Sequence, residues 1–334
     1  MKRLLWLPLV MLIVAACVDF PQQRNQDLVN RAVDAMGGAD ALAQLRTVVV
    51  KGTWKQWEPE QSAVPDGEMR FANEATFEST GDFTARSVRV DWVKNFAYPT
   101  ARTFKYTEIV TPEAGWVIGI DSNGRNKQNL ESKPPAHSMS GLRLAATQRE
   151  MRRVSPLLLL EMRNNPDKLF TQLSVVVDGV SYPAVKYDPG NYGYIVMFDP
   201  QSGLPARIRT LDYDYVWGDV DYDLVLSDWQ TVAGIKVAMS QKYVLNGSVV
   251  TDIRITDVTA NPAVPAGRFE PPAAVKAGAA KPATSYVHHQ WVLRRQFIGT
   301  YLDSDSTSFD VRATSSLRLV EIAPGVLHEV GGSH

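Results

Sequence analysis

The spacing of apolar residues along the chain changes from a helical to a strand-like pattern. Over residues 28–36, apolar side chains recur every three or four positions, which predicts a helix with one apolar face that ends at Gly37 and Gly38. A short second helix is expected over residues 39–45. From Thr47 onward, β-branched and aromatic residues are frequent, which predicts strands. The folded part of the chain therefore begins with two helices and continues as a sheet.

The rest of the pattern predicts one large sheet with a helical insertion. A helix is expected over residues 142–163, kinked or split at Pro156. Because the strand-like runs follow one another through tight turns, the sheet should be antiparallel. The expected fold class is α+β, with a large curved antiparallel sheet, a half-barrel, wrapped over helices. The expected strands are 47–54, 69–77, 86–92, 103–110, 115–120, 174–177, 184–187, 194–198, 206–215, 220–226, 235–245 and 249–258.

The N-terminus has the pattern of a secretory signal. Lys2 and Arg3 precede an apolar run over residues 4–16, which is shorter than the about 20 residues that span a bilayer. Small residues then lead into Cys17, the only cysteine in the chain. This arrangement resembles the lipobox of bacterial lipoproteins, and the resemblance implies lipid attachment at Cys17 and an exported, membrane-anchored protein that faces the periplasm. An ordinary signal peptide cut nearby, which leaves a free thiol, is the alternative.

Shifts in composition divide the chain into segments. Prolines and alanines accumulate after residue 260, as in an extended linker, and the last residues read as strand, Pro-Gly turn and strand. The expected organisation is a lipoprotein signal peptide at 1–16, a tether at 17–27, a half-barrel domain at 28–260, a linker at 261–285, a connecting segment at 286–316 and a β-hairpin at 317–334.

Composition and charge argue against a nucleic-acid partner and for a globular protein. With 35 basic and 36 acidic residues the net charge is -1, so the chain has no basic excess for binding nucleic acid. Apolar residues make up 45% of the chain, enough for a globular core. A single cysteine rules out an internal disulfide framework, so burial of apolar surface must supply the stability.

Several short sequence motifs follow one another between residues 28 and 272. They are the Ala-Met-Gly-Gly helix end at 35–38, the Lys-Gly pair at 51–52, Phe-Asp-Pro-Gln-Ser-Gly-Leu-Pro at 198–205, Asp-Trp-Gln-Thr-Val-Ala-Gly-Ile-Lys at 228–236 and Phe-Glu-Pro-Pro at 269–272. The series resembles the periplasmic lipoprotein carrier and receptor superfamily, the LolA-like half-barrels. The resemblance implies a helix-capped half-barrel that binds an acyl chain or another apolar ligand without catalysis.

The tail carries a second resemblance. Residues 319–332 are similar to the opening strands of the metallo-β-lactamase fold, whose zinc ligands come from a His-x-His-x-Asp-His motif further along the chain. This sequence has no His-x-His. The alternative function is therefore an accessory N-terminal portion of a truncated metallohydrolase, with zinc held only by a downstream domain. Neither reading identifies a protein partner.

Motifs for other chemistry are absent. The chain has no Gly-x-Ser-x-Gly elbow and no glycine-rich phosphate loop, so no catalytic residue is predicted. His288 and His289 are adjacent, and adjacent side chains on a strand point to opposite faces, so no metal site is predicted there. Aspartates recur from Asp212 to Asp223, and their alternation with apolar residues predicts a hairpin with an apolar inner face and a solvated acidic outer face.

The candidate site is an apolar cavity on the inner face of the sheet. Ligand pockets are largely apolar, and most tryptophans here lie in or beside predicted strands. Core packing is the alternative role for each of them. The candidate lining residues are Trp54, Trp92, Trp116, Leu157, Leu160, Tyr213, Tyr215 and Trp217.

Overall fold

The computed structural model describes most of the chain. For residues 7–20 only the backbone is described. The described residues are 7–58, 62, 64–65, 67–97, 101–121, 136–139, 141–190, 193–214, 218–277, 279 and 318–330.

The main sheet decides the fold class. Strands make up 53% of the structure and helices 20%, and one large antiparallel sheet that does not close on itself holds most of the strands. The expected α+β class is therefore wrong, and the fold is mainly β. The reason is strand length: the strand expected over residues 220–226 extends over Gly218–Val232, because its hydrogen bonding to the next strand continues through Trp229 to Val232.

The main sheet has 13 strands in the order β6-β5-β4-β3-β2-β1-β15-β14-β13-β12-β11-β10-β7. Two runs of neighbouring strands meet where β1 pairs with β15, so the first and last strands of the domain lie together in the middle of the sheet. The first run comprises β1 (Thr47–Glu58), β2 (Arg70–Asp82), β3 (Ser87–Phe96), β4 (Arg102–Val110), β5 (Gly115–Gly119) and β6 (Ala136–Ser138). The second comprises β7 (Leu169–Thr171), β10 (Ala184–Tyr187), β11 (Tyr194–Phe198), β12 (Pro205–Asp214), β13 (Gly218–Val232), β14 (Ile235–Leu245) and β15 (Ser248–Ala260).

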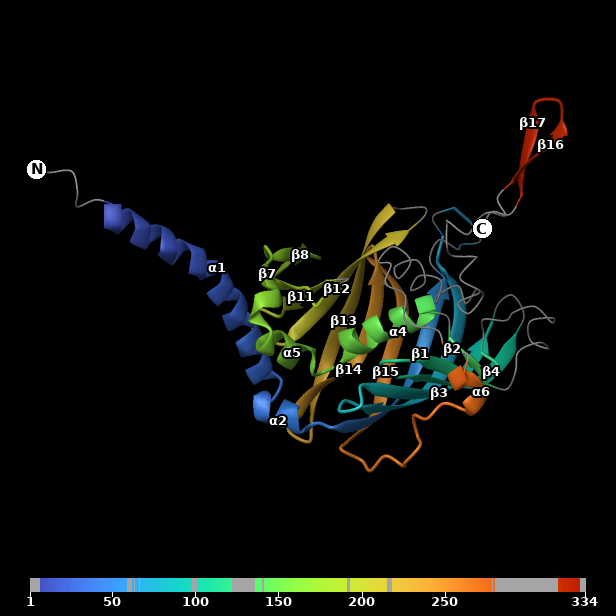
Figure 1. The fold of residues 1–334 in the computed structure, drawn as a ribbon, viewed down its shortest axis with the longest axis horizontal. Coiled ribbons are helices and arrows are strands. Elements are labelled where there is room, and N and C mark those ends of the chain that lie inside the picture. Colours follow the sequence, from blue (N-terminus) through green and yellow to red (C-terminus); the bar gives the residue numbers. More distant parts are fainter. Residues whose placement is uncertain are drawn as a thin grey trace, which may run out of the picture.

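The helices α4 and α5 lie on one face of this sheet. Figure 1 shows α4 and α5 beside the strands, with α1 running away from them toward the N-terminus. The helix expected over residues 142–163 is split around Pro156, as proline requires. Across the described residues, no helix combines the length and apolarity needed to cross a membrane. The helices are α1 (Leu7–Ala35), α2 (Ala39–Gln44), α4 (Gly141–Val154), α5 (Leu158–Asn164) and α6 (Ala273–Ala277), with a 3-10 turn at Pro166–Lys168.

The main apolar core joins the helices to what we call the inner face of the sheet, the face on which α4 and α5 lie. The residues predicted to form the apolar face of the first helix enter this core, with Val29, Ala32 and Val33 fully buried. They pack with Leu158 and Met162 of α5 and with side chains from the second run of strands. Burial of each valine, leucine or methionine in this core contributes about 1.5–3 kcal/mol, so the core fixes the helices over the sheet.

A close backbone contact anchors the end of α1. Gly37, with φ of 119°, lies so near the turn between β13 and β14 that a Cβ atom there would be 2.2 Å from the Gly234 carbonyl oxygen. The amide of Lys236 also donates a hydrogen bond to the Met36 carbonyl at 2.9 Å. Only glycine allows this approach, which explains the glycine that ends the helical pattern.

A smaller cluster covers the opposite, outer face of the sheet. Ile109 of β4 and Trp116 of β5 pack there against Val275 of α6. The segment expected as a linker over residues 261–285 thus packs on the sheet in its described part. Pro272 immediately precedes α6, and alanine favours the helix that follows.

Two separate hairpins complete the described structure. One is formed by β8 (Val175–Val177) and β9 (Val180–Tyr182). The other, β16 (Arg318–Ala323) and β17 (Val326–Val330), is the strand pair predicted in the tail, and Gly325 in its turn has φ of 74°. The connecting segment expected over residues 286–316 lies outside the described residues.

Candidate ligand cavity

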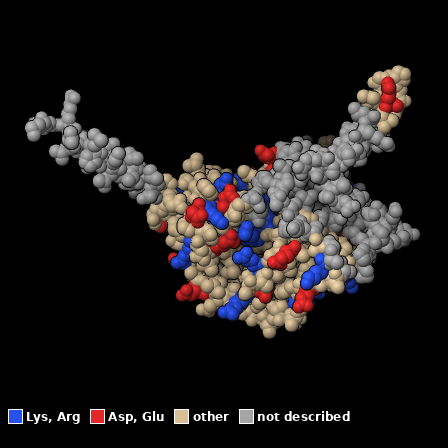
Figure 2. Space-filling view, viewed as in Figure 1, with Lys and Arg blue, Asp and Glu red and all other residues tan. Residues whose placement is uncertain are grey.

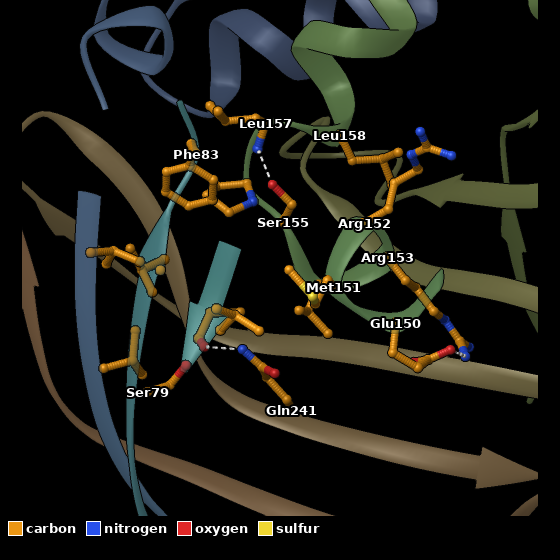
Figure 3. A pocket seen from close by; sticks show the side chains of 18 of the residues that line it. Ser79, Phe83, Glu150, Met151, Arg152, Arg153, Ser155, Leu157, Leu158 and Gln241 are labelled. Atoms are coloured by element: carbon orange, nitrogen blue, oxygen red, sulfur yellow. Dashed lines mark hydrogen bonds and ion pairs between the residues drawn. The ribbon is translucent and has the colours of Figure 1, made fainter. Parts of the chain in front are cut away.

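A cavity of about 1030 Å³ lies between the inner face of the sheet and the helices α4 and α5. Its size is at the upper end of the range of small-molecule pockets. Figure 3 shows Met151, Leu157 and Leu158 on its helical side, and Ser79 of β2 and Gln241 of β14 on its sheet side. The lining therefore comes from both runs of strands and from the helical insertion between them.

The structure brings four of the candidate residues together at this cavity. Trp54 of β1 and Trp92 of β3 line it from the sheet, and Leu157 and Leu160 line it from α5 and the residue before it. Trp116 lies elsewhere, fully buried in the outer-face cluster. On β5 its neighbour Val117 takes the inner position and packs in a core with Leu144 of α4.

The other three candidates are not placed by the structure. The backbone of Tyr213 belongs to β12 and is paired with Asp219, but its side chain is outside the described residues. Tyr215 and Trp217 also lie outside the described residues.

Aromatic rings from neighbouring strands form one wall of the cavity. The rings of Trp54 and Trp92 meet edge to face at 5.5 Å, and Phe77 of β2 lies 5.4 Å from Trp92. Gly52 makes room for this arrangement, because a Cβ atom there would lie 2.8 Å from the Phe77 ring. Tyr243 of β14 extends the wall, with its ring 6.5 Å from that of Trp54. Such a wall suits an apolar ligand.

The helix α4 carries a row of buried arginines above the sheet. Arg143, Arg149 and Arg153 are each 2% exposed or less. Arg149 donates to the Asp212 carboxylate at 2.6 Å, and Arg153 donates to the Ile208 carbonyl at 2.6 Å. These contacts hold α4 at a fixed position over the sheet. These buried arginines were not predicted from the sequence, because arginine is usually exposed.

The buried Asp212 corrects one prediction. The alternation had placed Asp212 on a solvated outer face, whereas it is 5% exposed and lies on the inner face beneath α4. Across the hairpin it pairs with the buried Val220, and the next inner pair is Thr210 with Tyr222. Asp223 does lie on the outer face, but it is only 3% exposed and is paired with Arg209 at 2.7 Å, so it is not solvated as predicted. Nothing in the described part of the chain gathers three or more metal-ligating side chains.

A lysine is the exception among the apolar groups of the aromatic wall. Lys94 of β3 lines the cavity, and its ammonium lies 4.3 Å from the centre of the Trp92 ring. Burial lowers the pKa of Lys94 below its usual value of 10.5, and the negative charge of Glu108 opposes that shift. The ammonium therefore sits where a charge is costly unless a counter-charge approaches.

Comparison with known proteins gives weak structural likenesses. No protein-family model matches the chain, and no curated protein matches its sequence. A LolA superfamily protein from Nitrosomonas europaea is similar in structure over 74% of this chain and 97% of that one, with a TM-score of 0.39 and 11% identity. A β-barrel-like protein of a domain of unknown function, DUF1849, from Brucella abortus matches over 65% and 99%, with a TM-score of 0.23 and 6% identity.

These matches give no support to the metallo-β-lactamase resemblance of the tail. At such TM-scores the likenesses establish no function, so the function is inferred from the cavity itself.

Proposed function

We propose that this protein binds an acyl chain or another apolar ligand in the cavity between the sheet and α4–α5, without catalysis. One observation carries the proposal: a space of about 1030 Å³ is lined mostly by apolar side chains from both runs of strands and from the helices, with charged and polar groups among them. Trp54, Trp92 and Phe77 supply rigid rings, and Leu157 and Leu160 supply flexible aliphatic groups opposite them. A long apolar chain would bury most of its surface there.

The length of the bound chain tests this proposal. Each methylene group transferred from water into an apolar site contributes about 0.8 kcal/mol. Affinity for a series of saturated fatty acids is therefore expected to rise roughly 15-fold for every two added methylenes, until the cavity is full. Displacement of a fluorescent fatty acid measures it. Affinity that does not change with chain length, or no binding at any length, would contradict the proposal.

We further propose that the mature protein is exported and anchored by lipid on Cys17, at the periplasmic side of the cell envelope. The sequence pattern before Cys17 supports this, and two or more acyl chains on one residue give stable anchoring. The mass of the N-terminal peptide from protein purified out of envelope membranes tests it. We expect a peptide that begins at Cys17 and carries acyl chains, lost in Cys17→Ser. An unmodified Cys17 in the mature protein would refute lipid attachment.

A further inference from the structure

Lys94 is held among ring faces rather than among carboxylates. Its Nζ lies 4.3 Å from the centre of the Trp92 ring, 5.6 Å from Trp54 and 5.7 Å from Tyr106. With the residues that the structure describes, this ammonium forms no hydrogen bond and no ion pair. Lys94 is partly buried, and its side chain lines the cavity. A cation–π contact of this kind stabilises a lysine less than an ion pair with full hydrogen bonding.

The carboxylates near Lys94 are already engaged by another cation. Glu108 accepts hydrogen bonds from the Trp92 indole at 2.8 Å and from the Arg143 guanidinium. Asp121 accepts from the same guanidinium at 2.7 Å. Arg143 therefore takes up both acidic groups, which act on Lys94 through their charge and not through contact. Toward the cavity, the ammonium has unused capacity to donate hydrogen bonds.

We propose that Lys94 binds the anionic head group of the ligand, so that the cavity selects single-chain amphiphiles with an ionised carboxylate or phosphate over neutral ones. This inference rests on the proposed function. A head group at Lys94 would place the apolar chain along Trp54 and Phe77 and beneath α5. A charge-assisted hydrogen bond in a site shielded from water is stronger than a neutral one, which gives the selectivity its physical basis.

The head group of the ligand tests this assignment. Hexadecanoic acid, hexadecyl phosphate and hexadecanol share one chain and differ in charge. The wild type is expected to bind the two anions roughly 10- to 100-fold more tightly than the alcohol, the range for a hydrogen bond to a charged group. Preference for the phosphate alone would point to a phospholipid-type head, and equal preference for both anions would point to charge recognition.

Two variants separate head-group binding from a structural role. Lys94→Met is expected to abolish the preference for anions while it leaves affinity for hexadecanol within about twofold. Lys105→Met is the matched control, because Lys105 lies on the next strand with its side chain exposed, and it should bind like the wild type.

Equal affinity for acid and alcohol in the wild type would overturn the assignment but leave the apolar site intact. Equal weakening of both ligands by Lys94→Met would also overturn it. Absence of binding by all three ligands would contradict the proposed function itself.

The pH dependence gives a second readout. The charged groups facing Lys94 are Glu108, Asp121 and Arg143, and burial outweighs them to lower the pKa of Lys94. Because the bound anion needs a protonated lysine, the preference should be full below this lowered pKa and should decline as pH rises through it. The decline is expected to begin below pH 10.5, while affinity for hexadecanol stays constant. In Lys94→Arg the preference should persist to higher pH, and an unchanged profile would contradict the role of Lys94.

Discussion

Replacing Ser79 with tryptophan is expected to lower affinity for long-chain ligands by at least 100-fold. Ser79 lies on the inner face of β2 and lines the cavity, where Figure 3 shows it on the sheet side. An indole at this position takes the space of several methylene groups. Losing about four buried methylenes costs about 3 kcal/mol, which is more than 100-fold in affinity. Displacement of a fluorescent fatty acid, with a thermal unfolding curve for each variant, measures the effect.

The control for this change lies on the same strand. Thr76 is exposed on the outer face of β2, so Thr76→Trp should leave the affinity unchanged. Val90 of β3 also lines the cavity and is paired with Ser79, so Val90→Phe provides a second, smaller obstruction if Ser79→Trp does not fold. A folded Ser79→Trp protein with wild-type affinity would show that the ligand binds outside the cavity.

Replacing Arg149 with methionine is expected to lower the free energy of unfolding by about 3–5 kcal/mol. Arg149 is fully buried and donates to Asp212 at 2.6 Å and to the Thr210 hydroxyl at 3.0 Å. Without the guanidinium, the Asp212 carboxylate stays buried without its counter-charge, and breaking a buried ion pair from one side costs this much. Urea denaturation, followed by tryptophan fluorescence, measures the change.

The paired and surface variants show whether burial causes the effect. The double variant Arg149→Met with Asp212→Leu should recover most of the lost stability, because no unpaired charge remains. Arg254→Met removes a guanidinium that lies 3.2 Å from Asp252 but whose side chain is 54% exposed, and it should cost below about 1 kcal/mol. If Arg149→Met were as mild as Arg254→Met, the buried ion pair would not be what holds α4 on the sheet.

Figure 2 shows where such charges lie on the surface of the molecule. Basic and acidic side chains are interspersed over the visible face of the described part, with no large area of a single sign. Positive and negative charges are therefore balanced locally on this face as well as over the whole sequence. The head-group selectivity proposed above would then come from groups inside the cavity, such as Lys94, rather than from a charged exterior.

Local patterns predicted the elements better than the fold class. The helix over residues 28–36 followed from apolar spacing, and Pro156 marked the break between α4 and α5. The predicted fold class was wrong because the sequence marks the ends of strands only weakly. For example, β13 continues well beyond Leu226 through a polar stretch, which its pairing with β14 explains. The register between strands depends on the tertiary structure, so it is difficult to predict from one sequence.

The same limit applies to the cavity. Trp54 and Trp92 were found from their aromatic character, but the face on which a strand residue lies depends on where the alternation starts. That phase was misjudged for Asp212, which lies inward. Lys94 and Arg149 were missed because charged side chains ordinarily face water, and only the packing of α4 over the sheet shows that theirs do not.

Native mass spectrometry with lipid extraction, on mature protein purified from its host, tests the central claim most directly. If the cavity holds an apolar ligand, a co-purifying acyl species should be present at about one per protein, should be released by organic solvent, and should be absent from Ser79→Trp. A clean mass of the unliganded protein, unchanged after incubation with fatty acids and alkyl phosphates, would contradict the claim.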